Sequence, residues 1–171
     1  MPRVLCIRHW LAAAALAAAG LAHAHTVDGQ VVAVQDGDTV TILDAARVQH
    51  RVRIAGIDAP EKGQAFGKAA KQSLARLVHG RRVEARCPKR DRYGREVCSL
   101  YLGARDVGLE QVRGGYAWWY REYAREQTPD DRLAYEAAES DARGARRGLW
   151  NDQAPQPPAS FRREQARARG A

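Results

Sequence analysis

Residues 31–57 read VVAVQDGDTVTILDAARVQHRVRIAGI, and their pattern indicates a fold built on β-strands. The β-branched residues fall into three runs, at residues 31–34, 39–43 and 48–57. Short segments of turn chemistry, Asp36-Gly37-Asp38 and Asp44-Ala45-Ala46, separate these runs. We therefore predict three sequential antiparallel strands joined by tight turns.

A helix and a second pair of strands are expected next. Apolar residues recur at helical spacing from Phe66 to Val78, and Gly80 marks the end of this helix. Residues 82–87 and 97–102 are typical of two strands around the turn Tyr93-Gly94. An antiparallel pairing of these two strands is the simplest arrangement.

Two further helices are predicted in the C-terminal third. Asp106 can cap a short helix that runs to Arg113, and Thr128-Pro129-Asp130-Asp131 opens a longer helix that stops before Gly148. The resulting order favours a mainly β fold, a five-stranded Greek-key barrel of the OB type with about three helices. The number and order of the predicted strands are also compatible with other small α+β folds.

The first 24 residues are predicted to be a secretory signal peptide. Arg3 and Arg8 precede an uncharged run over residues 11–22, and Ala22-His23-Ala24 has the form of a cleavage site. This run is shorter than the roughly 20 residues that span a bilayer, so a permanent membrane anchor is the weaker interpretation. We expect a secreted or periplasmic protein that begins at His25 and has no stable membrane association.

The chain is basic, with 28 Lys and Arg against 20 Asp and Glu and a net charge of +8. Loss of the signal peptide would leave +6. Most of the cations are Arg, whose planar fork pairs with phosphate, so polyanions are the expected partners. The length excludes a multi-domain enzyme. We predict one domain over residues 25–151, a disordered Pro/Arg-rich tail over 152–171 and a monomer.

Two cysteines remain after removal of the signal peptide, Cys87 and Cys98. Export to an oxidising compartment favours a disulfide between them. Antiparallel pairing of their strands could bring the two Cα atoms within bridging range. Two free buried thiols remain the alternative.

Acidic residues gather at two predicted strand ends of this basic chain. Asp36 and Asp38 lie in the first turn, and Asp58 and Glu61 follow the third strand, close to Arg53 in the sequence. Ca²⁺ needs several carboxylate and carbonyl oxygens converging on one point, and like charges repel unless a cation neutralises them. An Asp-Gly-Asp sequence alone is more often an ordinary turn, so the combination carries the argument.

Three blocks carry a family resemblance: DGDTV at residues 36–40, RIAGIDAPE at 53–61 and DRYGR at 91–95. In sequence, order and spacing they resemble the signature blocks of the thermonucleases, the staphylococcal-nuclease-like secreted endonucleases. The likeness covers roughly residues 27–151. It implies an OB-fold barrel that uses Ca²⁺ to cleave the phosphodiester bonds of DNA and RNA and leaves 3′-phosphate ends.

The resemblance also implies a metal site. Asp38 and Asp58 correspond to carboxylate ligands of calcium, and Ala59 to a ligand that binds through its backbone carbonyl. The family's type member has threonine at this third position, which matters little if only the main-chain oxygen binds. Asp36 and Thr39 would support these ligands.

The catalytic roles implied by the resemblance fall to Glu61, Arg53 and Arg95. Glu61 would act as the general base or orient the attacking water, and the two arginines would contact the scissile phosphate. Physical chemistry supports these roles, because a phosphodiester anion repels hydroxide unless its charge is offset. An arginine is a poor proton donor, so the leaving group would take its proton from water.

Aromatic residues suggest how nucleotides bind. By resemblance, Tyr123 and Tyr93 line the nucleotide pocket and Arg92 lies near a terminal phosphate, whereas Trp118-Trp119-Tyr120 is assigned to packing. An OB barrel can also hold single strands without cutting them, so a non-catalytic binding module is the alternative. Such a module would not need Arg53, Glu61 and Arg95 together.

Overall fold

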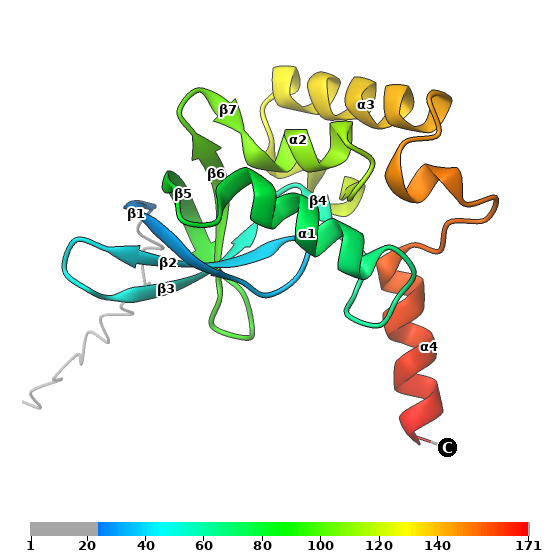
Figure 1. The fold of residues 1–171 in the computed structure, drawn as a ribbon, viewed down its shortest axis with the longest axis horizontal. Coiled ribbons are helices and arrows are strands. Elements are labelled where there is room, and N and C mark those ends of the chain that lie inside the picture. Colours follow the sequence, from blue (N-terminus) through cyan, green and yellow to red (C-terminus); the bar gives the residue numbers. More distant parts are fainter. Residues whose placement is uncertain (1–23, 171) are drawn as a thin grey trace, which may run out of the picture.

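The computed structural model describes residues 24–170, and within them five strands form a closed barrel (Figure 1). The strands are β1 (His25–Val34), β2 (Thr39–Asp44), β3 (Gln49–Ile54), β5 (Arg82–Arg90) and β6 (Glu96–Leu102). Their order is β3-β2-β1-β5-β6, and neighbours in this order pair antiparallel. Parallel pairing of β3 with β6 closes the barrel. The predicted OB-type barrel is confirmed.

Helices and short strands complete the fold. The helices are α1 (Gly67–Val78), α2 (Val107–Arg113), α3 (Pro129–Gly144) and α4 (Pro158–Gly170), with 3-10 helices η1 (Arg121–Glu126) and η2 (Gly148–Asn151). The short strands are β4 (Ile57–Asp58), β7 (Arg105–Asp106) and β8 (Trp118–Trp119). In Figure 1, α2 and α3 lie side by side on the barrel, while α4 stands apart from them. None of the described helices is long and apolar enough to span a membrane.

Two helices begin where the sequence places their caps. The side chain of Asp106 accepts a hydrogen bond from the backbone N–H of Leu109 at the start of α2. The hydroxyl of Thr128 accepts one from the N–H of Asp131, and Pro129 follows as the first residue of α3. Each cap satisfies a backbone donor that the first helical turn leaves unpaired.

The barrel core consists of alternate residues of the strands. Val31, Ile42, Ile54 and Leu100 are fully buried, and Leu74 of α1 packs in the same cluster. Polar residues alternate with them and face the other way, as the period of two in a strand requires. The predicted third strand is interrupted after β3, and its last residue, Ile57, begins β4, which pairs with β8 instead.

The predicted disulfide is present between Cys87 of β5 and Cys98 of β6. Their Cα atoms lie 4.2 Å apart, and both residues are buried. The bridge therefore ties together two neighbouring strands of the barrel.

The C-terminal tail differs from the expectation of disorder, because α4 forms there. Pro158 at the start of α4 is buried, and the side-chain amide of Gln64 donates to the backbone carbonyl of Gln156 at 2.6 Å. Arg162 adds ion pairs to the barrel. These contacts are long-range and polar, so neither composition nor apolar periodicity indicates them. The predicted signal peptide lies outside the described residues, apart from Ala24.

Candidate active site at the mouth of the barrel

The turn between β1 and β2 brings two carboxyl groups to the mouth of the barrel. The N–H of Asp38 donates to Oδ1 of Asp36 at 3.0 Å. Gly37 between them is packed so closely that an added Cβ would lie 2.7 Å from the Cβ of Ala70. The buried amide of Gln111 donates to the carbonyl of Gly37 at 2.9 Å, so α2 fixes this turn.

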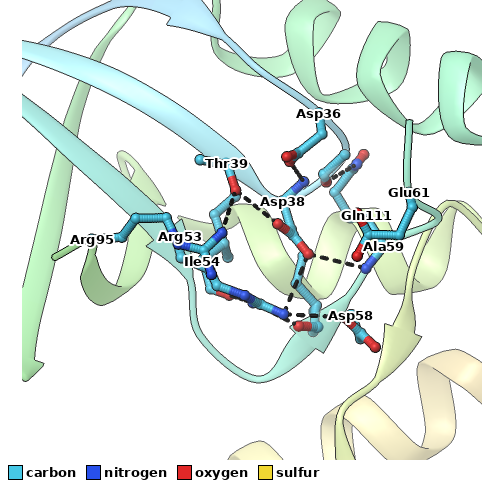
Figure 2. Close-up of polar contacts among 12 residues, drawn as sticks. Asp36, Asp38, Thr39, Arg53, Ile54, Asp58, Ala59, Glu61, Arg95 and Gln111 are labelled. Atoms are coloured by element: carbon cyan, nitrogen blue, oxygen red, sulfur yellow. Dashed lines mark hydrogen bonds and ion pairs between the residues drawn. The ribbon is translucent and has the colours of Figure 1, made fainter. Parts of the chain in front are cut away.

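Arg53 joins the two central acids (Figure 2). Its Nη2 lies 3.2 Å from Oδ1 of Asp58 and 3.4 Å from Oδ2 of Asp38. Its Nη1 donates to the backbone carbonyls of Ile54 and Ile57 at 2.9 and 3.0 Å. Burial opposes the charge of Arg53, but the two carboxylates outweigh it and raise its pKa. The guanidinium is therefore charged and fixed in direction.

The three predicted metal ligands lie together. Oδ2 of Asp38 accepts the N–H of Ala59 at 3.1 Å, and Oδ1 accepts the hydroxyl of Thr39 at 2.9 Å. Asp38 and Asp58 are only 7% and 4% exposed. Carboxylate and backbone carbonyl oxygens are the hard donors that Ca²⁺ prefers, and Ala59 directly follows Asp58 in the chain.

The electrostatics of this cluster also suit a cation. Burial raises the pKa of Asp58. Burial, followed by the negative charge of Asp38, raises the pKa of Asp36 to about 6. Carboxyl groups that are costly to ionise in the protein alone would be stabilised in their charged form by a bound divalent cation.

Arg95 reaches the same mouth from the loop between β5 and β6. Its Nε donates to Oδ2 of Asp91 at 2.7 Å, and its Nη1 lies 3.4 Å from the hydroxyl oxygen of Thr39. Asp91 also accepts the backbone N–H groups of Tyr93 and Arg95. These bonds outweigh the effect of burial and lower the pKa of Asp91. The loop thus holds its own arginine toward the barrel.

These groups face a cleft of about 750 Å³. Most of the predicted site residues line it: Asp36, Asp38, Arg53, Ala59, Glu61, Arg92, Tyr93, Arg95 and Tyr123. Asp58 and Thr39 are not part of the lining, and both are buried beside it. The structure therefore brings together residues from all three sequence blocks.

Aromatic and basic residues form the outer wall of the cleft. Tyr93 and Tyr123 are 66% and 41% exposed, so their rings are accessible to a planar ligand. The guanidinium carbon of Arg92 lies 4.8 Å from the ring centroid of Tyr93, and Nζ of Lys89 lies 4.8 Å from that of Tyr123. Each ring thus lies beside a cation that can contact phosphate.

The cleft lining includes further residues that were not predicted from the sequence, among them Tyr120, Lys89 and Arg162. Tyr120, which was assigned to packing, does pack edge to face against Tyr123, with 4.9 Å between ring centroids. Its ring also lines the cleft, where the guanidinium of Arg53 lies 5.8 Å from its centroid. Trp118 does pack, edge to face, against Trp150. The period of two in a strand, continued from the buried Trp119 at the end of β8 to the partly exposed Tyr120, would indicate that Tyr120 faces outward.

The fold and the site together define an OB-fold protein with carboxylates and arginines at its mouth, which suits an anionic substrate and a metal ion. The staphylococcal nuclease homologue family matches residues 51–152. An uncharacterized endonuclease of Haemophilus influenzae is 37% identical over 136 residues, covering 80% of this chain and 73% of that protein. A micrococcal nuclease of Shigella flexneri is 40% identical over 144 residues, covering 79% and 80%. The chain belongs to the staphylococcal nuclease homologue family.

Proposed function

We propose that this chain, a nuclease by its family, is a secreted Ca²⁺-dependent endonuclease that hydrolyses DNA and RNA and leaves 3′-phosphate ends. One observation carries the proposal. Asp38 and Asp58, two buried carboxyl groups, meet at Arg53 beside a cleft that Glu61 and Arg95 also line. A binding module would gain nothing from burying two acids where a polyanion must approach.

Calcium would be held by the carboxylates of Asp38 and Asp58 and the backbone carbonyl of Ala59. When bound, the ion would offset the negative charge of the phosphate and act as a Lewis acid. The remaining chemistry falls to the side chains of the chain itself.

Arg53 and Arg95 bind the scissile phosphate from two sides of the mouth and stabilise the charge that develops on its oxygens. The contacts of Arg53 with backbone carbonyls and those of Arg95 with Asp91 hold both groups in place before the substrate arrives. This arrangement lowers the reorganisation that the reaction requires. Glu61, which has a partly exposed carboxyl group, accepts a proton from the attacking water.

Tyr93, Tyr123 and Tyr120 provide aromatic surfaces for the nucleotides, and Arg92 provides a contact for a neighbouring phosphate. Stacking on aromatic rings tolerates any base. Stacking also needs no contact with the sugar 2′-hydroxyl, which supports action on both DNA and RNA.

The proposal is tested by incubating purified protein with circular plasmid and with single-stranded RNA, in Ca²⁺ and then in excess chelator. We expect cleavage of both substrates in Ca²⁺ and none in chelator, and products that a polymerase extends only after phosphatase treatment. Intact but electrophoretically retarded nucleic acid in both conditions would instead support the binding module.

The proposed export and oligomeric state have tests of their own. N-terminal sequencing of protein recovered from outside the cytoplasm should give His25 as the first residue, and a different start contradicts the predicted cleavage. Gel filtration with light scattering should give the mass of a monomer.

A further inference from the structure

Arg162 of α4 lies at the candidate metal site. Its Nη1 donates to Oδ1 of Asp58 at 3.1 Å and to Oε1 of Glu61 at 2.6 Å, and its Nη2 donates to Oδ2 of Asp58 at 3.0 Å. One guanidinium therefore contacts both oxygens of Asp58 and also reaches Glu61. The two partners lie more than a hundred residues earlier in the sequence, so the side chain of Arg162 ties α4 back to the mouth.

These contacts compete with the proposed reaction. Asp58 is the proposed metal ligand and Glu61 the proposed acceptor of a proton from water, and Arg162 occupies the oxygens that both roles need. A guanidinium also repels a divalent cation placed beside the same carboxylates. Arg162 lines the cleft, whereas the carboxyl group of Asp58 is buried behind it.

Few other contacts hold α4 in place: residues 159–161 are half-buried, and the side-chain amide of Gln156 donates to Glu164 at 2.8 Å. Pro158 is its only buried residue, and every described residue from Arg162 onward is exposed. The hydrogen bond from Gln64 to Gln156 anchors the segment before the helix, so α4 can leave the mouth while the chain stays attached. Release of α4 from the mouth exposes little apolar surface. The ion pair between Arg162 and Asp58 has one half-exposed partner, so salt weakens it.

We propose that α4 is a built-in competitive inhibitor: Arg162 occupies Asp58 and Glu61 in the resting protein, and calcium displaces it when the site is loaded. The inference rests on the proposed function, because it takes Asp58 as a calcium ligand. The arginines of α4 can pair with phosphate groups. The released helix can therefore bind the nucleic-acid backbone.

The direct test is the calcium affinity of protein beginning at His25, measured by isothermal titration calorimetry without substrate. Arg162→Ala should bind Ca²⁺ about tenfold more tightly than wild type, as expected if the resting site is free about one-tenth of the time. Arg163→Ala is the matched control, because this neighbouring exposed arginine bonds Ser160 and neither acid. It should stay within twofold of wild type, and equal or weaker binding by Arg162→Ala overturns the inference.

A second readout concerns α4 itself. Calcium should increase amide hydrogen exchange over residues 158–170 of the wild type, because the displaced helix loses its anchor at Arg162. Unchanged exchange on calcium binding also contradicts the inference. Thermal unfolding of both variants checks that they fold.

Calcium binding and the inhibitory role of α4 are distinguished by the outcomes for the two proteins. If wild type and Arg162→Ala bind Ca²⁺ equally well, only the inhibitory role of α4 is wrong. If neither binds Ca²⁺, the calcium assignment is wrong and the inference falls with it. If Arg162→Ala cleaves more slowly at saturating Ca²⁺ without binding it more tightly, Arg162 assists the reaction and does not inhibit it.

Discussion

The backbone N–H of Ala59 donates to Oδ2 of Asp38 at 3.1 Å, across 21 residues of sequence. This bond joins the turn before β2 to the residue after β4 and places two proposed calcium ligands side by side. The backbone carbonyl of Asp38 in turn accepts the N–H of Ile54 at 2.8 Å. Because the barrel backbone holds this mouth in shape, single substitutions of outward-facing side chains should change the chemistry without unfolding the protein.

Glu61→Gln should reduce the cleavage rate at least about a hundredfold, because the amide cannot accept the proton of the attacking water. The substitution keeps the size of the side chain, and the carboxyl group it removes is partly exposed, so the unfolding midpoint should change little. Initial rates on a short single-stranded oligonucleotide measure the effect. Glu136→Gln, at an exposed position on α3, is the control and should behave as wild type. A rate within a few-fold of wild type for Glu61→Gln would remove Glu61 from the reaction.

Arg53→Lys and Arg95→Lys should each lose at least about tenfold in rate at saturating substrate. Lysine keeps the charge but lacks the planar fork that contacts two oxygens at once. For Arg53, the change also removes the bonds to the carbonyls of Ile54 and Ile57. Single-turnover rates give the loss, and Arg82→Lys, exposed on β5 and outside the cleft, provides the comparison. Full activity in either variant would show that charge alone is needed at that position.

His50 should make stability depend on pH near neutrality. Burial alone would lower its pKa, but contacts of its ring nitrogens with Asp44 at 3.1 Å and Glu96 at 3.4 Å outweigh burial and raise it. The charged ring therefore stabilises the fold below its unfolded pKa of about 6.5, and this stabilisation is lost as pH rises through the higher folded pKa. The free energy of unfolding, measured with urea, should fall as pH rises through this range in the wild type but not in His50→Gln. Parallel curves for the two proteins would contradict the role of these contacts.

The double variant Cys87→Ala/Cys98→Ala should lose about 3 kcal/mol of unfolding free energy, the loss expected for a loop closed across 11 positions. Chemical denaturation measures the difference, and a reducing agent should destabilise the wild type by a similar amount. No response of the wild type to reductant would show that the thiols are free in solution.

Local chemistry made much of this fold and site predictable. The turn Asp36-Gly37-Asp38 and the caps at Asp106 and Thr128 are short-range features, and each lies where the sequence places it. The cluster of Asp38 and Asp58 could be anticipated because Asp38 directly precedes β2 and Asp58 follows closely after β3, the strand that pairs with β2.

Long-range contacts account for what the sequence does not reveal. Tyr120 faces the cleft because a two-residue strand, β8, pairs with β4 and sets the direction of its neighbours. Helix α4 is anchored mainly by Arg162 on Asp58 and Glu61, partners that no periodic pattern connects to it. The composition of this segment predicts disorder, because the segment lacks the apolar residues of an ordinary packed helix.

Asp38 and Asp58 are proposed to bind a calcium ion on which hydrolysis depends. The most direct measurement is the calcium dependence of single-turnover cleavage of one oligonucleotide by wild type and Asp58→Asn, with calorimetric Ca²⁺ binding measured on the same preparations. We predict cleavage by the wild type that rises with Ca²⁺ occupancy and vanishes in chelator, and loss of both binding and cleavage in Asp58→Asn. Cleavage by the wild type at an undiminished rate in excess chelator would contradict the account.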